Sequence, residues 1–432
     1  MEMIMKVETI GKEIIKPSAK TTNDLRTLQL SMIDHLMPPV YTVAFLFYTK
    51  NDLISQEQTS HKLKTSLSET LTRFYPFAGR INGVTIDCND QGTIFVDARV
   101  DNILLSSFLK SPDFEYLKLL LPLDAEATPT WPLLLVKATY FKCGGMAIGI
   151  CISHKLADAA SLSTFVRAWT TIARGESDSV ASLEFAGTKL YPPANEAFKV
   201  PEEDQAGKRT SVTKRFVFVA SKVEKLRNKA ASEDVARPTR VQCVTSLIWR
   251  CVVAASPDTT REKMLSQPAN LRPKIPSLLS DNLIGNLMFS TLTFNESKGE
   301  VEIVETVKKL KKRGEDLTLL VQIEEGSSIT IGSKLIGQMM DNNSKISYET
   351  HEPHTVTSWC KMQLYDASFG WGSPVWVAGN VVPALANVTV LIDSKDGEGI
   401  EAWVTLYQED MSLFEQNQEL LAFASPNLDV LV

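Results

Sequence analysis

The sequence predicts a mixed α/β protein built from two units of similar size. Its 432 residues correspond to two or three domains at about 150 residues each. Short β-branched and aromatic runs alternate with amphipathic helical patterns along most of the chain. We find no internal repeat with a period of about 20–50 residues, which argues against a solenoid or a propeller.

The first half alternates predicted strands and helices. Residues 41–48 (YTVAFLFY) and 145–153 (GMAIGICIS) are rich in β-branched or other apolar residues and predict buried strands. Residues 56–74 and 158–174 each place apolar side chains three and four positions apart and predict amphipathic helices. Residues 81–97 predict a β-hairpin, with its turn near Asp90, Gln91 and Gly92.

The regular pattern is lost between about residues 176 and 213, where three prolines and an acidic run occur. We expect a crossover between two domains here. The expected division is an N-terminal domain over residues 1–190, a crossover loop over 191–213 and a C-terminal domain over 214–432.

Helical patterns return in the second half of the chain, at residues 221–231, 240–255 and 301–313. The helix at 301–313 begins with acidic and ends with basic residues, which matches the helix dipole. From residue 354 onward the chain is rich in strand patterns. Each half therefore predicts its own mixed sheet with helices.

Composition excludes several classes of function. Basic residues number 45 and acidic residues 51, a net charge of −6, whereas a general nucleic-acid binder shows a basic excess. Charges and prolines interrupt the densest apolar stretch, 117–136, so we expect no membrane span. The first residues lack the apolar core of a signal peptide, and we expect a cytoplasmic protein. No heptad pattern suggests an oligomer, so we expect a monomer.

The six cysteines form no CxxC pair, so the sequence predicts neither a zinc site nor a redox motif. In a chain of this length they indicate buried free thiols in a reducing compartment. They are Cys88, Cys143, Cys151, Cys243, Cys251 and Cys360.

His154 is the strongest catalytic candidate among five histidines. It directly follows the predicted strand 145–153 and precedes the predicted helix, a place where a rigid scaffold presents side chains at a cleft. Asp158, four residues later, either caps that helix or orients the backbone that holds His154. As a bare pattern, HxxxD is common by chance.

The other histidines carry weaker signals. His351 and His354 form HEPH, but Pro353 breaks a helix between them and no third ligand is near, so we expect a loop pair without metal. We expect His35 to be structural or to line a cleft, and His61 to be solvated.

Two further segments attract attention. In YDASFGWGSPVWVAG, residues 365–379, Gly370 and Gly372 permit a tight turn that Phe369 and Trp371 anchor. We favour a structural turn over direct chemistry. Residues 208–229 hold eight basic side chains against Glu224. This segment either faces a phosphorylated cofactor or forms a solvated surface, and the second is more common.

The string SHKLADAASL around His154 resembles the HxxxD motif of the BAHD family of plant acyl-CoA-dependent acyltransferases. SFGWG, residues 368–372, resembles the family's second signature, DFGWG. Further stretches are similar to family blocks, so the resemblance covers nearly the whole chain: LSMIDHL, LSETLTRFYPFAGRI, IDCNDQG, VTSLIWRC, NLRPKIP and EAWVTLYQEDM.

This resemblance implies the CoA-dependent acyltransferase fold, with two similar domains, a crossover loop and a solvent channel between them. Acyl-CoA is then a co-substrate that enters opposite the acceptor, and no tightly bound cofactor is expected. His154 matches the family's general base. Asp158 matches the aspartate that points away and holds the loop by an ion pair, and the DFGWG segment is structural.

One position departs from the family pattern, because Ser368 replaces the aspartate of DFGWG. In the family that aspartate pairs with an arginine, and the matching residue here is Arg272, in NLRP. A buried unpaired arginine is costly. We therefore expect either Asp366, two residues earlier, to compensate, or Arg272 to be exposed.

The expected function is transfer of an acyl group, acetyl in the first place, to a hydroxyl of a small alkaloid or terpenoid. His154 takes the alcohol proton and no covalent acyl-enzyme forms, because a thioester is already activated. We expect Cys151 to be buried in its strand and not to act as nucleophile. The alternatives are transfer of an aromatic acyl group, transfer to an amine, or a non-catalytic member that binds a partner.

Overall fold

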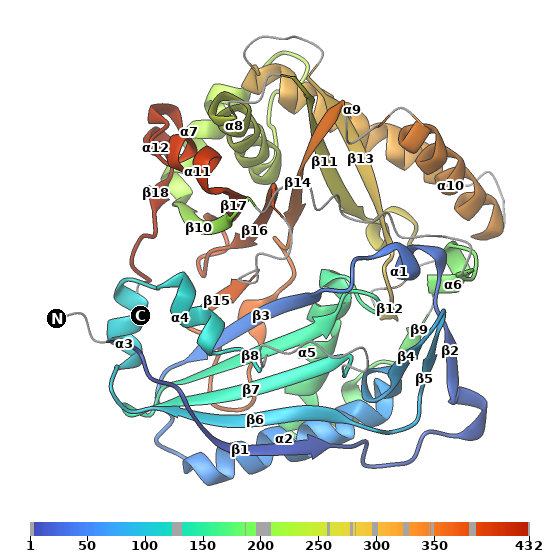
Figure 1. Ribbon diagram of the computed structural model, residues 1–432, viewed down its shortest axis with the longest axis vertical. Helices are drawn as coiled ribbons and strands as arrows, with labels where there is room; N and C mark the ends of the chain where they lie inside the picture. The colour runs from blue at the N-terminus through green and yellow to red at the C-terminus, as the bar shows by residue number, and fades with distance from the viewer. Residues whose placement is uncertain are drawn as a thin grey trace.

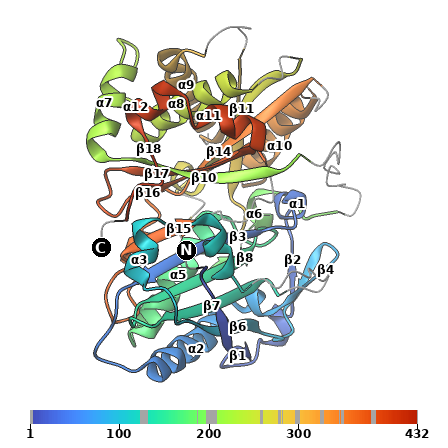
Figure 2. The ribbon, with the colours of Figure 1, turned by 60° about the vertical axis from the view of Figure 1, so that its left-hand side comes forward.

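The computed structural model describes residues 4–122, 132–185, 187–195, 209–256, 260–276, 280, 282–295, 301–322, 328–344, 346, 350–379 and 386–430. Two large mixed sheets form its two halves, and Figure 2 shows one above the other. Helices pack on both sheets, as an α/β protein requires.

The first sheet has six strands in the described part of the chain, in the order β1-β6-β7-β8-β3-β15. They are β1 (Glu8–Ile15), β6 (Thr93–Val100), β7 (Leu134–Phe141), β8 (Met146–Ser153), β3 (Tyr41–Tyr48) and β15 (Trp376–Gly379). Helices α2 (Gln56–Arg73) and α5 (Ala159–Ala173) cover one face (Figure 1). Their apolar sides share one core with β3 and β8.

The second sheet has the order β13-β11-β14-β16-β17-β10-β18. Its strands are β10 (Ser211–Phe218), β11 (Glu262–Asn270), β13 (Met288–Phe294), β14 (His351–Ser358), β16 (Val388–Asp393), β17 (Ile400–Tyr407) and β18 (Ser425–Pro426). Five helices share its apolar core: α7 (Ala220–Ala230), α8 (Arg240–Ala255), α9 (Ile303–Val321), α11 (Gln408–Phe414) and α12 (Gln418–Phe423).

The remaining elements are short, apart from one helix. Two small sheets consist of β2 (Thr27–Gln29), β4 (Arg80–Asn82) and β5 (Thr85–Asp87), and of β9 (Glu184–Phe185) and β12 (Leu283–Ile284). The helices are α1 (Met32–Leu36), α3 (Leu105–Lys110), α4 (Phe114–Leu119), α6 (Gly187–Leu190) and α10 (Ser328–Ser344). Single turns of 3-10 helix are η1 (Asn23–Leu25), η2 (Tyr75–Ala78), η3 (Ser177–Ser179), η4 (Arg272–Lys274) and η5 (Leu364–Asp366).

One strand from the second half of the chain joins the sheet of the first half. β15 comes from the second half of the chain but pairs antiparallel with β3 of the first sheet, Trp376 opposite Phe47, and Figure 2 shows the two strands side by side. The division at residues 190 and 213 stays a prediction, because residues 196–208 of the crossover lie outside the described residues. β10 already begins at Ser211, inside the expected crossover.

The strongly periodic predictions are confirmed. The strands expected at 41–48 and 145–153 and the helices expected at 56–74 and 158–174 lie within one residue of the observed elements. The helix expected at 301–313 is longer and extends to Val321. Side-chain capping adds to the apolar pattern, because α2 begins with a capping box between Ser55 and Gln58.

The predicted hairpin at 81–97 is wrong. The tight turn lies at Gly83, which has φ 57°, and joins β4 to β5. β6 leaves for the first sheet and pairs with β1 and β7 instead. The alternating pattern identified the strands, but Asp90–Gly92 forms the passage between two sheets and not a hairpin turn.

The expected loop at HEPH is also wrong, because His351 and His354 both belong to β14. Pro353 breaks a helix but is tolerated in this strand. His354 is buried, with Nε2 3.0 Å from Thr389 Oγ1. Within the described residues, no three His, Cys, Asp or Glu side chains gather as a metal site.

The basic segment 208–229 is largely a solvated surface, the more common of the two outcomes expected, because Arg209, Lys222, Lys225 and Lys229 are exposed and Arg215 alone of its described basic residues is buried. Arg215 forms a buried ion pair with Glu401, its Nε 2.6 Å from Oε2. Arg209, Lys214 and Lys229 pair with acidic side chains of α11, its C-terminal cap and α12. Residue 208 lies outside the described residues.

All six cysteines are free thiols, as predicted, but only four are buried. Cys143 and Cys360 are partly exposed. Among the described helices, none has a stretch long and apolar enough to cross a bilayer.

Burial of His354 predicts a pH-dependent stability. Burial lowers the pKa of His354 from 6.5 to about 3, so between these values the unfolded chain takes up a proton that the folded chain does not. Stability therefore falls by up to about 1.4 kcal/mol per pH unit as the pH drops through this window. In urea titrations, His354→Gln reduces this slope and the exposed His61→Gln does not. An unchanged slope in His354→Gln contradicts the account.

Candidate active site

His154 lies where β8 leaves the first sheet. All eight residues of β8 are buried, and the His154 backbone N–H donates to Val40 O at 2.9 Å. The side chain itself is only partly buried. The end of a rigid strand therefore holds His154 at a position that is only partly buried.

Asn286 fixes which ring nitrogen of His154 carries the proton. Its Oδ1 lies 3.1 Å from His154 Nδ1, and its Nδ2 donates to Asp34 Oδ1 at 2.8 Å and to His154 O at 2.7 Å. Both of those partners only accept, so the amide nitrogen must face them and the amide oxygen must face the ring. Because that oxygen cannot donate, a neutral His154 carries its proton on Nδ1. The lone pair on Nε2 is left free.

Asp34 in turn fixes the Asn286 amide. Asp34 Oδ1 accepts from the Asn286 backbone N–H (3.1 Å) and from its Nδ2. Oδ2 accepts from Ser31 N (3.0 Å) and from Ser31 Oγ (2.6 Å). The first of these bonds and the one from Asp34 N to Ser31 Oγ (3.2 Å) form the capping box of α1. Burial raises the pKa of Asp34, while hydrogen bonds from Ser31 and Asn286 lower it. Burial outweighs these four hydrogen-bond donors, so the pKa of Asp34 lies above its usual value.

Asp158 holds the other side of the site. It is the N-cap of α5, where Oδ1 accepts from Ser161 N at 2.8 Å, and its Oδ2 lies 2.8 Å from Arg272 Nη1. Burial alone raises the pKa of Asp158, but the charge and hydrogen bonds of Arg272 outweigh it, so the pKa lies below its usual value. Asp158 is therefore an anchored carboxylate and has no free lone pair aimed at His154.

Arg272 joins the second half of the chain to this anchor. Arg272 is 2% exposed, and its guanidinium donates to Leu283 O, Gly285 O and Ser161 Oγ as well as to Asp158. Gly285 has φ 142°, a conformation open to glycine. The fixed loop 283–287 ends with Leu287 N donating to Asp158 Oδ2 at 3.1 Å, which places Asn286 against His154.

The expected surroundings of Arg272 were wrong. Arg272 is buried, and its partner is Asp158, whereas Asp366 is exposed. Arg272 is therefore paired even though Ser368 replaces the motif aspartate.

The SFGWG segment forms the tight turn that its glycines predicted. Gly370 and Gly372 both have φ 103°, and Phe369 is fully buried against Trp169 of α5 at 4.8 Å between ring centroids. Arg174 Nη1 donates to Ser368 O at 2.7 Å. These contacts lie at the C-terminal end of α5, whereas Asp158 caps its N-terminal start, so this segment does not line the site.

Two residues close to His154 in the sequence, Cys151 and Lys155, have structural roles. Cys151 is buried as predicted, and burial raises the pKa of its thiol well above the usual value, so it supplies no thiolate. Lys155 Nζ donates to His35 O at 2.7 Å, which fastens the last turn of α1 beside the site. No sequence pattern singled out Asp34 or Asn286, although Asp34 lies in the string LSMIDHL.

Known proteins resemble this chain along its whole length. The model of the Transferase family matches residues 5–421. BAHD acyltransferase BIA1 of Arabidopsis thaliana is 43% identical and covers 98% of this chain and 99% of its own. The chain belongs to the BAHD acyltransferase family. The present chain is also 35% identical to limonoid 21-O-acetyltransferase of Melia azedarach, over 99% of this chain and 100% of the relative. It is 32% identical to stemmadenine O-acetyltransferase of Catharanthus roseus, over 96% of this chain and 97% of the relative.

Solved structures confirm the predicted two-domain acyltransferase fold. The crystal structure of vinorine synthase matches this BAHD acyltransferase with a TM-score of 0.83 at 30% identity, covering 98% of this chain and 99% of the other. TRI101 of F. sporotrichioides, complexed with coenzyme A and T-2, matches with a TM-score of 0.70 at 18% identity (93% and 99% covered). At 18% identity, the match to TRI101 supports the fold alone.

Removing the Asp158 charge tests the anchor. Asp158→Asn leaves Arg272 as a buried unpaired charge and lowers the free energy of unfolding by about 3–5 kcal/mol. Because the pKa of Asp158 is lowered in the folded state, its contribution is present above about pH 3.9 and is lost as the pH falls below it. In urea titrations, the free energies of unfolding of the wild type and of Asp158→Asn therefore approach each other as the pH falls below about 3.9. Glu115→Gln, in the exposed pair with Lys118, is the control. A constant gap down to pH 2 contradicts this account.

Proposed function

We propose that this protein transfers an acyl group, acetyl in the first place, from a coenzyme A thioester to a hydroxyl of a small specialised metabolite. Its relatives include limonoid and stemmadenine O-acetyltransferases. A fold neighbour was crystallised with coenzyme A, which supports a CoA thioester as donor. The proposal also includes action in the cytoplasm.

One observation carries the chemistry: the hydrogen bond of His154 Nδ1 to Asn286 leaves Nε2 as an unoccupied base. In the proposed step, Nε2 takes the proton of the acceptor hydroxyl while its oxygen attacks the thioester carbonyl. The tetrahedral intermediate then breaks its C–S bond. The thiolate takes the proton back from His154 and leaves as free coenzyme A, and the new ester remains on the acceptor.

The surrounding carboxylates have different roles in this proposal. Asp34 acts through Asn286, because it holds the amide whose oxygen accepts from Nδ1. Asp158 reacts with nothing and positions the loop. Both are positioning residues, and only His154 touches the reacting atoms.

A non-catalytic role gains no support from Ser368. Ser368 replaces the motif aspartate that was expected to pair with Arg272, and Arg272 is instead paired with Asp158. The aromatic-acyl and amine alternatives differ in substrate and not in the base.

Removal of the base tests the proposal. His154→Ala lowers release of free thiol from acetyl-CoA, with a panel of alcohols, by about 10²–10⁴-fold. His61→Ala changes another histidine of this chain, exposed on α2, and leaves the rate unchanged. Equal thiol release by His154→Ala and wild type contradicts the role of His154, and no release with any acceptor favours a binding protein.

Removal of the amide tests the positioning of the imidazole. Asn286→Ala lowers kcat by about 10–100-fold, a part of the roughly 10²–10⁴ that a general base supplies, and leaves KM for acetyl-CoA unchanged. Asn282→Ala, four residues earlier on the same segment, is the matched control and retains kcat. A rise in KM at constant kcat means that Asn286 binds substrate and does not orient His154.

A further inference from the structure

Helix α1 carries Asp34 but is too short to be stable by itself. It has five residues, whereas isolated helices shorter than about 12–15 residues are marginal in water. The position of Asp34, and with it that of Asn286 and His154, therefore depends on the residues that pack around α1. Gly187 of α6 and Lys155 make two of these contacts.

Gly187, the first residue of α6, leaves room for the Asp34 carboxylate. A Cβ atom at position 187 would lie 2.7 Å from Asp34 Oδ2 and 3.1 Å from Ser31 Oγ. The first distance is far inside the usual contact distance of about 3.5 Å between non-bonded heavy atoms. Gly187 does not have a positive φ, so its backbone conformation is open to any residue. The position therefore requires a glycine for space and not for conformation.

The Asp34 carboxylate is held on both of its oxygens. Oδ2 accepts from N and Oγ of Ser31, and Oδ1 accepts from N and Nδ2 of Asn286. A methyl group that pushes Oδ2 away therefore turns the carboxylate and lengthens bonds on one oxygen or on both. Because Asn286 Nδ2 is one of these donors, the disturbance reaches the amide that faces His154.

Lys155 fixes the other end of α1. Its Nζ donates to His35 O at 2.7 Å. Carbonyl groups in the last turn of a helix lack a partner within the helix, and Pro39, four residues after His35, has no N–H to offer. The Lys155 ammonium also interacts electrostatically with Asp34, while burial lowers the pKa of Lys155. Because Lys155 directly follows His154, it joins α1 to the stretch of backbone that presents the imidazole.

We propose that Gly187 and Lys155 are positioning residues for the acyl transfer. Together they fix α1 so that Asp34 holds the Asn286 amide, and the amide oxygen then keeps the proton of neutral His154 on Nδ1. Neither residue touches the reacting atoms. The proposal rests on the function proposed above, because the step that it favours is the one in which His154 Nε2 takes the proton of the acceptor.

Gly187→Ala tests the room beside Asp34. It lowers kcat for acetyl transfer by about tenfold, as expected when one hydrogen bond of the site is lost, and leaves KM for acetyl-CoA unchanged. Nitrogen NMR of the histidines shows a mixture of His154 tautomers in this variant. Gly337→Ala, on α10, is the matched control, because a Cβ atom there meets nothing within 4 Å, and it retains kcat and the single tautomer. An unchanged kcat, or a rise in KM in place of the fall in kcat, overturns the role of Gly187.

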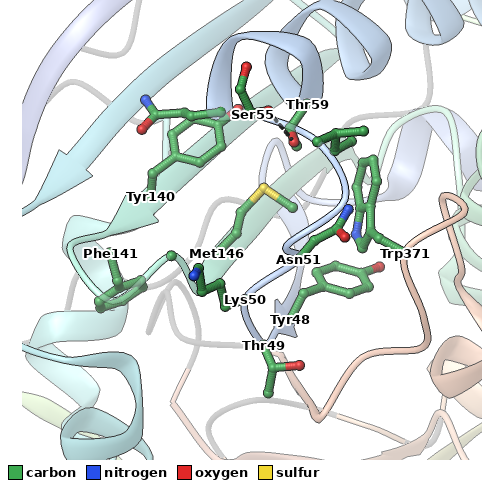
Figure 3. Close-up of a pocket in the computed structure, with 13 residues that line it drawn as sticks. Tyr48, Thr49, Lys50, Asn51, Ser55, Thr59, Tyr140, Phe141, Met146 and Trp371 are labelled. Carbon is green, nitrogen blue, oxygen red and sulfur yellow. Dashed lines mark hydrogen bonds between the residues drawn. The ribbon is translucent and has the colours of Figure 1, made fainter.

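A double-mutant cycle separates positioning from loss of stability. Because Gly187 acts through the amide, Gly187→Ala lowers kcat no further in an Asn286→Ala background. Met146→Ala is the control for stability: Met146 is buried at the opposite end of β8 from His154, in the pocket shown in Figure 3. This variant retains kcat below its unfolding temperature. Independent, multiplying effects of Gly187→Ala and Asn286→Ala, or an equal fall in kcat in Met146→Ala, overturn the proposal.

Lys155 gives a second test that holds even where Gly187→Ala fails to fold. Lys155→Met removes the donor to His35 O and lowers kcat by about three- to tenfold, whereas Lys155→Arg keeps a cation with N–H donors and restores part of the rate. Lys142→Met, an exposed lysine in the turn before β8, retains kcat. Equal rates for Lys155→Met and the wild type overturn the role of Lys155.

Failure of the proposed function gives a different result from failure of this inference. A wild type that releases no thiol with any acceptor contradicts the acyl transfer. The His154 tautomer, which NMR measures without substrate, then decides the inference. A single Nδ1 tautomer in both Gly187→Ala and Lys155→Met overturns it, and a mixture in these variants but not in Gly337→Ala supports it.

Discussion

The buried ion pair between Asp158 and Arg272 is the constraint on which the site depends. Asp158 caps α5 in the first half of the chain. Arg272, in the second half, donates hydrogen bonds to two carbonyl oxygens of loop 283–287, those of Leu283 and Gly285. A charge pair this deeply buried is stable only when all its donors and acceptors are satisfied. That requirement fixes the loop against α5 and so brings Asn286 to His154.

Two buried carboxylates serve this site through different physics. Asp158 is balanced by a full positive charge, which holds its pKa below the usual value against burial. Asp34 is held by four hydrogen-bond donors, it interacts electrostatically with Lys155, and burial leaves its pKa raised. Its hydrogen bonds to Asn286 hold the amide that faces His154.

Patterns in short stretches of sequence predicted those parts of the site whose residues are close together in the chain. The strand before His154, the helix after it and the cap at Asp158 follow from periodicity and residue type within about 30 residues. Asn286 lies 132 residues from His154, and Asp34 lies 252 residues from Asn286, so no local pattern joins them. The Arg272 partner was misplaced for the same reason, and β15 joined a sheet that its position in the chain does not indicate.

The central claim is that His154 holds its proton on Nδ1 and presents a bare Nε2. Nitrogen NMR of protein labelled at histidine measures this directly, since the chain has five histidines and His154→Ala identifies the signal. The account predicts a protonated Nδ1 and an unprotonated Nε2 for neutral His154 in the wild type, and a mixture of tautomers in Asn286→Ala. A proton found on Nε2 in the neutral wild type contradicts it.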